Sequence, residues 1–597
     1  MIGEHNPLVR MGRDKENSIL SWGSARHGRS FSGKSDFVLR VRLLLGGILI
    51  VAFVLVGRLY FVQIVEGEEW LAEASAQYVA PIVESDRRGD ILFSDQSGRL
   101  IAAATTKAGY RVAIAPDLLT DSQTFEKLSA IIELDEETFR ARAAKAGDPY
   151  EEIAERVSEE QIAAIHALDL DGVIISQQHW RFYPADSLAS HVIGFTGFRG
   201  HDRLGRYGLE RYFEDTLNRG SSNLYVNFFA ELFSSAYAGG QGSASHGDLI
   251  TSIDPPVQLN LERTLEGIAD KWNTKNAGGI IMDPKSGEIV GMAAHPTFDL
   301  NKFSDVEDAA TYSNPLVERV YELGSIMKPI TMAAGLDAGV VTPKTEYNDL
   351  GCIMKSGARI CNYDGEARGR VDMQQVLSQS LNTGASFVAD KIGHDEFAKY
   401  LRNFGLGEET GVDLPGEVAG LLGALDSGSD VDYASASFGQ SIAVTPIAMI
   451  RALAGLANDG ILPEPHVVKA VRYKNGITRP VHFDEGRRVT SPEAAHTVTD
   501  MLVNVVDDAL LEGVLKQEHY SIAAKTGTAQ IASPGGYYDD RYLHSFFGYF
   551  PAKDPKFIIF LFALEPQGVK YASQTLAHPF MDLTKFIINY YNIPPDR

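Results

Sequence analysis

Ser325 and Lys328 stand three residues apart in the segment YELGSIMKP, where an apolar helical pattern begins. Residues at this spacing share one face of a helix, so a hydroxyl and an amine come within hydrogen-bond reach. Pro329 is tolerated only in the first turn of a helix, which predicts that the helix begins near Ser325. The pair suits a serine nucleophile with a lysine base. Taken alone, however, the pattern fits a capping serine beside an exposed lysine better.

Two further motifs favour the chemical interpretation. LSQSLNTGASF places Ser380 and Asn382 in a break between two helical runs, and IAAKTGTAQ places Lys525 on an apparent strand. Read singly, the first of these would be a helix cap. The motifs S-x-x-K, S-x-N and K-T-G in this order are the signature of penicillin-recognising serine enzymes. We therefore expect the three segments to meet in one active site.

Each polar side chain of this signature has a chemical task. Lys328 accepts the serine proton only if it is neutral near pH 7, which requires burial and a second cation nearby. Lys525 is the expected cation. Ser380 is suited to relay a proton from Lys328 to the leaving amine. The amide of Asn382 carries donors and an acceptor, so it suits the peptide carbonyl of a substrate and the lysine together.

The strand SIAAKTGT is expected to bind an extended peptide. Its small residues, including Gly527, leave the strand bare so that a substrate backbone can pair with it. The charge of Lys525 and the hydroxyls of Thr526 and Thr528 would then hold a terminal carboxylate. The backbone N–H groups of Ser325 and Thr528 form the expected oxyanion hole. A plain core strand with a glycine bulge is the alternative.

The two cysteines of the chain, Cys352 and Cys361, lie symmetrically about Ser356-Gly357. This symmetry predicts a hairpin with a two-residue turn, in which the cysteines face each other as a non-hydrogen-bonded pair. Such pairs have Cα atoms about 4.5 Å apart, at the lower edge of what a disulfide accepts. We predict a disulfide here. Two small apolar side chains on the hairpin are the alternative.

The N-terminal segment predicts a membrane anchor. Residues 1–42 carry more basic than acidic side chains, and Arg58 is the single charge within the apolar run 43–65. A transmembrane helix needs about 20 such residues. The positive-inside rule places residues 1–42, a polar tail without periodicity, in the cytoplasm and the rest of the chain outside. A cleaved signal peptide and a buried core helix are alternatives that this length disfavours.

Composition excludes other classes of protein. The net charge of −23 argues against a nucleic-acid partner. The sequence contains no P-loop, dinucleotide fingerprint or zinc-binding motif, and its histidines are scattered. We therefore expect neither a cofactor nor a metal.

The remaining pattern indicates two extracytoplasmic domains. From about residue 66 to 245, short strands such as RGDILFSD and DGVIISQQ mix with acidic helices, notably over 136–168. The Gly/Ser-rich stretch 234–248 then breaks this pattern. After it, the sequence predicts a helix near 256–272 and a strand hairpin around the turn DPKSG. Helices through 325–460, the late hairpin FFGYFPAKDPKFIIFLFAL and a C-terminal helix complete the chain's predicted elements. This order predicts an α/β (α+β) fold in which a helical subdomain interrupts a central antiparallel sheet.

These segments together resemble the class B penicillin-binding proteins. The family's N-terminal motifs are similar to three segments of this chain, RRGDILFSDQSGRLIA, RFYPADSLASHVIGF and GRYGLERYFEDTLNRG. The start of its catalytic domain is similar to MDPKSGEIVGMAAHPTFDLN. FGQSIAVTPIAMIRALAGLANDG is similar to a further family segment, although Ser441 stands where glycine is usual. The resemblance implies a single transmembrane helix (43–65), an elongated pedestal or dimerisation domain (66–250) and a transpeptidase domain (251–597).

The same resemblance implies a function in cell-wall synthesis at the inner membrane. Ser325 would attack the D-Ala-D-Ala bond of a peptidoglycan stem peptide, release D-Ala, and hold an acyl-enzyme until an amine of a neighbouring stem resolves it. β-Lactams would acylate the same serine. Asn382 resembles the septal type of enzyme, so the expected role is cell division. The expected partners are a membrane-embedded glycan polymerase and other division-complex membrane proteins.

The sequence is also compatible with three alternative functions. The first is an elongation-type transpeptidase that maintains cell shape. The second is a D,D-carboxypeptidase or β-lactamase-like hydrolase, which passes the acyl group to water through a general base. The third is a non-catalytic β-lactam sensor or scaffold.

Overall fold

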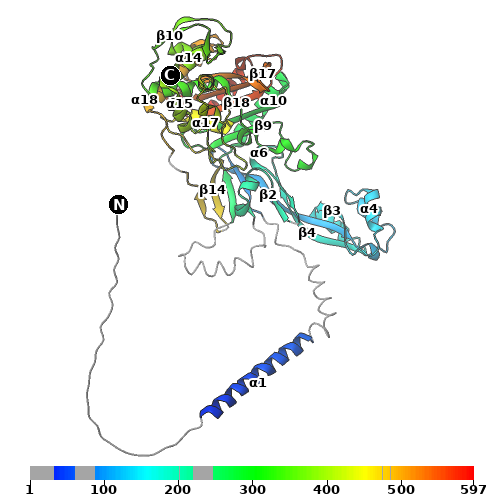
Figure 1. Cartoon of the computed structure of the whole chain (residues 1–597). Coiled ribbons are helices and arrows are strands. Elements are labelled where there is room, and N and C mark those ends of the chain that lie inside the picture. The colour runs from blue at the N-terminus through cyan, green and yellow to red at the C-terminus, as the bar shows by residue number, and fades with distance from the viewer. Residues whose placement is uncertain (1–32, 61–87, 201, 219–245, 474, 484–485) are drawn as a thin grey trace, which may run out of the picture. The chain divides into compact units, whose positions relative to one another are not determined.

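The computed structural model describes residues 33–60, 88–200, 202–218, 246–473, 475–483 and 486–597. The chain forms two units, Met1–Pro81 and Ile82–Arg597. In the first unit, helix α1 (Gly33–Tyr60) contains most of the predicted membrane span (Figure 1). Among the described residues, no helix is both long enough and apolar enough to cross a membrane. Residues 61–65 of the predicted span, and most of the predicted tail, lie outside the described residues.

In the second unit, one sheet joins strands from distant parts of the chain. Its order is β15-β14-β7-β1-β2-β3, with β4 also paired to β2. Strand β7 is parallel to β1 and antiparallel to β14, so two late strands, β14 and β15, join a sheet that otherwise belongs to the predicted pedestal. The strands are β1 (Ile91–Ser94), β2 (Leu100–Ile114), β3 (Glu151–Val157), β4 (Val173–Phe182), β7 (Gly247–Thr251), β14 (Val468–Tyr473) and β15 (Thr478–Pro480).

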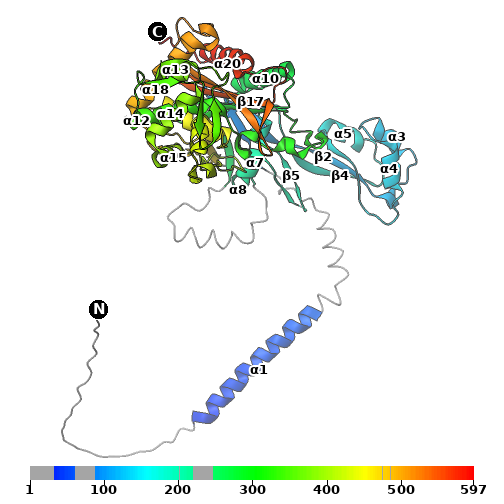
Figure 2. The ribbon, with the colours of Figure 1, turned by 45° about the horizontal axis from the view of Figure 1, so that its top comes forward.

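Long strands β2 and β4 extend from this sheet into an arm with its own small core (Figure 2). Helices α3 (Thr124–Ser129), α4 (Glu136–Ala143) and α5 (Glu159–His166) pack there around buried apolar side chains. The prediction of helices throughout residues 136–168 was wrong at β3, which pairs with β2. Pairing with β2 and burial of Val157 override the helix propensity of the glutamates in this segment.

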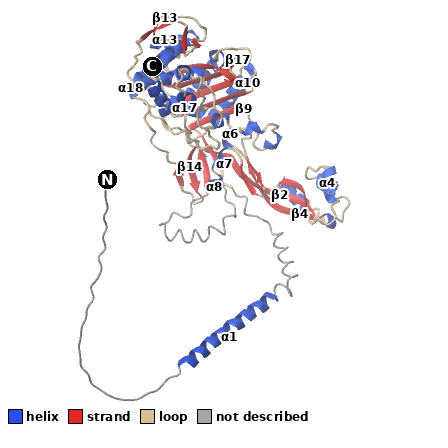
Figure 3. Cartoon of the chain, viewed as in Figure 1, coloured by secondary structure: helices blue, strands red, loops and turns tan. Residues whose placement is uncertain are grey.

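A five-stranded antiparallel sheet forms the centre of the C-terminal part (Figure 3). Its order, β16-β17-β18-β8-β9, places the late strands beside the early ones, which confirms the predicted insertion of a helical subdomain between them. Helix α10 (Pro255–Trp272) packs on this sheet through apolar side chains at helical spacing, and α20 (Ala577–Tyr590) packs beside it. The strands are β8 (Asn276–Met282), β9 (Ile289–His295), β16 (Ala523–Ser533), β17 (Gly536–Phe550) and β18 (Phe557–Leu564).

The inserted helical subdomain carries two of the three motifs. A 3₁₀ turn, η6 (Gly324–Met327), leads directly into α12 (Lys328–Asp337), whose first eight residues are all buried. Helix α12 packs against α14, α17 and α18, and α17 is buried along its whole length. Further helices of this part are α13 (Met373–Ser378), α14 (Asn382–Ile392), α15 (His394–Asn403), α16 (Asp430–Ala436), α17 (Pro446–Ala457) and α18 (Pro492–Asn504).

Candidate active site

Ser325 lies on the 3₁₀ turn η6, and Lys328 is the first residue of α12. The helix therefore begins slightly later than predicted, with Pro329 in its first turn. Lys328 Nζ lies 2.9 Å from Ser325 Oγ. Gly324, at φ +66°, approaches β16 so closely that a Cβ there would lie 3.1 Å from the backbone of Thr528. This glycine thus brings the Ser325 backbone beside Thr528, the second expected oxyanion donor.

The second motif occupies the predicted break between α13 and α14. Ser380 has φ +57°, a left-handed conformation that turns both its carbonyl and its hydroxyl toward Lys328. Lys328 Nζ donates to Ser380 O at 2.6 Å and to Asn382 Oδ1 at 2.8 Å, and it lies 3.1 Å from Ser380 Oγ. The motif therefore surrounds the lysine amine with oxygen atoms.

The third motif lies on β16, the terminal strand of the central sheet. Lys525 Nζ donates to Ser380 Oγ at 3.0 Å and to Thr526 O at 3.0 Å. Lys328 and Lys525 have exposed fractions of only 1% and 2%. The structure thus brings Ser325, Lys328, Ser380, Asn382 and Lys525 together, as the motif order led us to expect.

The hydrogen-bond partners of Lys328 determine where its lone pair can point. Ser380 O and Asn382 Oδ1 are acceptors only, so each must receive an N–H. A neutral amine has two N–H groups, and both are used by these contacts. The lone pair then faces the hydroxyls of Ser325 and Ser380. In its neutral form Lys328 is therefore arranged to accept the Ser325 proton.

Electrostatics favour this neutral form. Burial, followed by the charge of Lys525, lowers the pKa of Lys328 well below its usual value. Burial also lowers the pKa of Lys525 to about 7. As the pH falls below 7, Lys525 gains a proton and opposes protonation of Lys328. The site therefore retains a neutral base beside a cation.

The roles of Gly527 and Thr528 differ in detail from the expectation. A Cβ on Gly527 would lie 2.3 Å from Ser545 Oγ and 2.6 Å from Leu323 O. This glycine therefore lets the segment leading into η6 pack on the strand, in addition to any contact with substrate. Thr528 Oγ1 accepts a hydrogen bond from Ala572 N at 3.1 Å. The Thr528 hydroxyl proton is not used in that contact, so the side chain can still donate.

Ser441 adopts the conformation expected of a glycine. Its φ is +62°, and its N–H donates to Glu322 Oε1 at 3.0 Å. The turn thus forms despite the serine. Glu322, three residues before Ser325, also accepts from Tyr537 Oη at 3.1 Å. Sequence reasoning did not identify this contact, because it joins three distant segments.

The cysteine hairpin also contacts the site. Cys352 and Cys361 are joined in a disulfide, with Cα atoms 4.0 Å apart, and their strands pair in the register that the sequence predicted. Asn382 Nδ2 donates to Cys361 O at 2.9 Å. The amide of Asn382 thus bonds the hairpin as well as Lys328, a contact that the sequence did not reveal. Within the described ranges, no group of three or more His, Cys, Asp or Glu could hold a metal.

Family models and curated relatives of known name match most of this chain. A family model of the penicillin-binding protein transpeptidase domain matches residues 277–584, and one of the penicillin-binding protein dimerisation domain matches residues 84–227. The stage V sporulation protein D of Bacillus subtilis is 30% identical over 92% of this chain and 85% of its own length. The peptidoglycan D,D-transpeptidase FtsI of Buchnera aphidicola is 27% identical over 93% of this chain and 96% of its own length.

Solved structures share the fold. A crystal structure of penicillin-binding protein 3 from Mycobacterium tuberculosis with aztreonam has a TM-score of 0.65 at 23% identity, over 86% of this chain and 97% of that one. A crystal structure of penicillin-binding protein 2X from Streptococcus thermophilus has a TM-score of 0.69 at 20% identity, over 85% of this chain and 81% of that one. With its transpeptidase and dimerisation regions and its three motifs gathered around one serine, this chain belongs to the class B penicillin-binding proteins.

Proposed function

We propose that this protein is a peptidoglycan D,D-transpeptidase with Ser325 as its nucleophile. The observation that carries this proposal is the arrangement around Lys328 Nζ, which lies 2.9 Å from Ser325 Oγ while Ser380 O and Asn382 Oδ1 use its N–H groups. A neutral Lys328 removes the Ser325 proton, and Oγ attacks the carbonyl carbon of the D-Ala-D-Ala bond. The backbone N–H groups of Ser325 and Thr528 stabilise the oxyanion.

The proton then moves toward the leaving group. Ser380 Oγ lies between the two lysine amines, at 3.1 Å from Lys328 Nζ and 3.0 Å from Lys525 Nζ. Through this hydroxyl, the proton on Lys328 reaches the amine of the departing D-Ala. An amine of a second stem peptide attacks the acyl-enzyme by the reverse sequence of proton transfers, forming the cross-link and releasing Ser325.

The substrate carboxylate lies at the β16 end of the site. Lys525 Nζ has three N–H groups when charged, and two are directed to Ser380 Oγ and Thr526 O. The third, together with the hydroxyls of Thr526 and Thr528, holds the terminal carboxylate of the stem peptide or of a β-lactam. Because Gly527 has no side chain, Leu323 and Ser545 pack closely against this strand and hold it in position beside Ser325.

We further propose a septal role at the inner membrane. The asparagine at position 382 and the relative named FtsI support division over elongation. Residues 1–42 form a cytoplasmic tail, 43–65 a single membrane span, 66–250 the pedestal and 251–597 a periplasmic transpeptidase domain. An oxidising compartment is consistent with the disulfide. The partners are a membrane-embedded glycan polymerase and other division proteins.

Labelling with fluorescent penicillin tests the nucleophile. Wild-type protein should be labelled, whereas Ser325→Ala should not. Ser378→Ala is a matched control, because this serine lies nearby on α13 and its Oγ bonds Gln374. It should be labelled like wild type. Labelling that persists in Ser325→Ala would exclude Ser325 as the nucleophile.

Two assays separate the alternative functions. Lipid-linked precursor supplied with the glycan polymerase should yield cross-linked stems. Release of D-Ala without cross-links would instead identify a carboxypeptidase, and labelling without either product would identify a sensor. Depletion in cells should give filaments, and rounded cells would assign the enzyme to elongation.

A further inference from the structure

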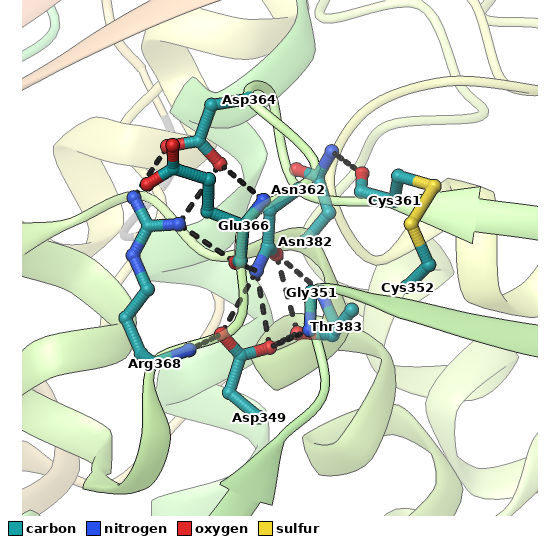
Figure 4. The surroundings of a disulfide bond; sticks show 10 residues. All are labelled: Asp349, Gly351, Cys352, Cys361, Asn362, Asp364, Glu366, Arg368, Asn382 and Thr383. Atoms are coloured by element: carbon teal, nitrogen blue, oxygen red, sulfur yellow. Dashed lines mark hydrogen bonds and ion pairs between the residues drawn. A yellow bond between two sulfur atoms is a disulfide. The ribbon is translucent and has the colours of Figure 1, made fainter.

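The orientation of the Asn382 amide is set by the disulfide hairpin. Cys361 O accepts from Asn382 Nδ2 at 2.9 Å (Figure 4). This contact leaves Asn382 Oδ1 to face Lys328 Nζ at 2.8 Å. A backbone carbonyl can only accept, so the nitrogen side of the amide must point to Cys361. One carbonyl of the hairpin therefore decides which atom of Asn382 meets the catalytic lysine.

This orientation matters for the proton transfer. With Oδ1 toward Lys328, the amide uses an N–H of the lysine and leaves the lone pair facing Ser325. With the amide reversed, Nδ2 would donate to Lys328 and compete with Ser325 for that lone pair. The same side chain would then hinder the base that it otherwise prepares.

A disulfide and two hydrogen bonds hold the Cys361 carbonyl in place. Strands β11 (Cys352–Lys355) and β12 (Ala358–Cys361) are closed by the disulfide at the end nearest Asn382. The next residue, Asn362, donates its backbone N–H to Gly351 O at 2.9 Å. Its side chain accepts from Thr383 N at 3.2 Å, so Asn362 is bonded to the residue after Asn382. Hairpin and motif are thus joined at two consecutive positions.

The carboxylate of Asp349 connects the residue after the hairpin, Asn362, to the residue after Asn382, Thr383. This carboxylate is 1% exposed and accepts from Thr383 Oγ1 at 2.6 Å and Arg368 N at 2.9 Å. Both of its oxygens accept from Asn362 Nδ2 at 3.0 Å (Figure 4). Burial opposes its ionisation, but these hydrogen bonds outweigh burial and hold the pKa of Asp349 below its usual value. The network therefore stays charged and connected at neutral pH.

We propose that the Cys352–Cys361 disulfide and Asp349 act as positioning groups for catalysis. They hold the Cys361 carbonyl so that Asn382 presents Oδ1, and not Nδ2, to Lys328. Loss of the disulfide frees this carbonyl and lets the Asn382 amide reverse, which lowers the rate of Ser325 acylation. This inference rests on the proposed function, in which Lys328 is the base for Ser325.

A double-mutant cycle tests the proposal in the full-length protein. The second-order rate constant for acylation by a fluorescent penicillin is measured for wild type, Cys352→Ser/Cys361→Ser, Asn382→Ala and the triple variant. The cysteine variant should lose between about 10- and 100-fold, the range typical of a misplaced catalytic group. If the disulfide acts through Asn382, its removal should cost nothing further in the Asn382→Ala background.

The controls separate positioning from general destabilisation. Lys355→Met removes another tie of the hairpin, the ion pair with Asp390 on α14, without touching Asn382, so acylation should stay at the wild-type rate. Asp349→Asn should behave like the cysteine variant. Independent, multiplicative losses in the triple variant would overturn the inference, as would an unchanged rate in the cysteine variant. Failure of wild type to be acylated would instead refute the proposed function itself.

Discussion

Replacing Lys525 with methionine should shift the pH dependence of acylation. The Nζ atoms of Lys328 and Lys525 lie 3.1 and 3.0 Å from Ser380 Oγ, so they are at most about 6 Å apart. At an effective dielectric constant of about 20, two unit charges at that distance repel by about 2.8 kcal/mol. This energy corresponds to a change of about 2 in the pKa of Lys328.

The direction of the shift follows from the sign of this interaction. Because the pKa of Lys525 is about 7, its cation is present throughout the acidic pH range, where it opposes protonation of Lys328. Lys525→Met removes that cation while burial of the site remains, so the pKa of Lys328 rises. The neutral fraction of Lys328 then falls at any given acidic pH. The acid limb of the acylation profile should move to higher pH by about 2 units.

The assay is the second-order rate constant for acylation by a β-lactam, measured from acidic to alkaline pH. The plateau should also fall, because in the proposed mechanism Lys525 binds the substrate carboxylate, but the position of the acid limb reports the electrostatic effect. Lys399→Met, on the surface of α15, is the matched control and should leave the profile unchanged. An acid limb that stays in place, or moves to lower pH, would refute the coupling between the two lysines.

Three further changes have defined outcomes. Removing the disulfide by Cys352→Ser/Cys361→Ser should lower the free energy of unfolding by about 2.5–3 kcal/mol on the chain-entropy model, measured by urea denaturation; an unchanged midpoint would contradict this. In wild type, the free energy of unfolding contributed by ionised Asp349 is lost as the pH falls through its depressed pKa. Asp349→Asn lacks this contribution at every pH, so its free energy of unfolding should depend less steeply on acidic pH. Gly527→Ala should slow acylation by about 100-fold or more, because its Cβ would lie 2.6 Å from Leu323 O and displace η6; near-normal kinetics would refute that packing argument.

The local features of this protein follow from its sequence. The spacing of Ser325 and Lys328, the break that carries Ser380 and the register of the Cys352–Cys361 hairpin all depend on residues close together in the chain. Helix periodicity, the first-turn preference of proline and the two-residue hairpin turn act over such short distances. The order of the motifs then predicts that they meet, without predicting how.

The tertiary structure decided the contacts between distant segments. The entry of β14 and β15 into the sheet of β1 and β7 joins residues more than two hundred positions apart, and no local pattern encodes it. The bond from Asn382 to Cys361 likewise depends on how the hairpin packs against α14. Residue types allow such hydrogen bonds, but only packing selects the partner, because many donors and acceptors could satisfy the same amide. The motifs of the sequence therefore predict which side chains come together, and packing selects which atom of each side chain faces the next.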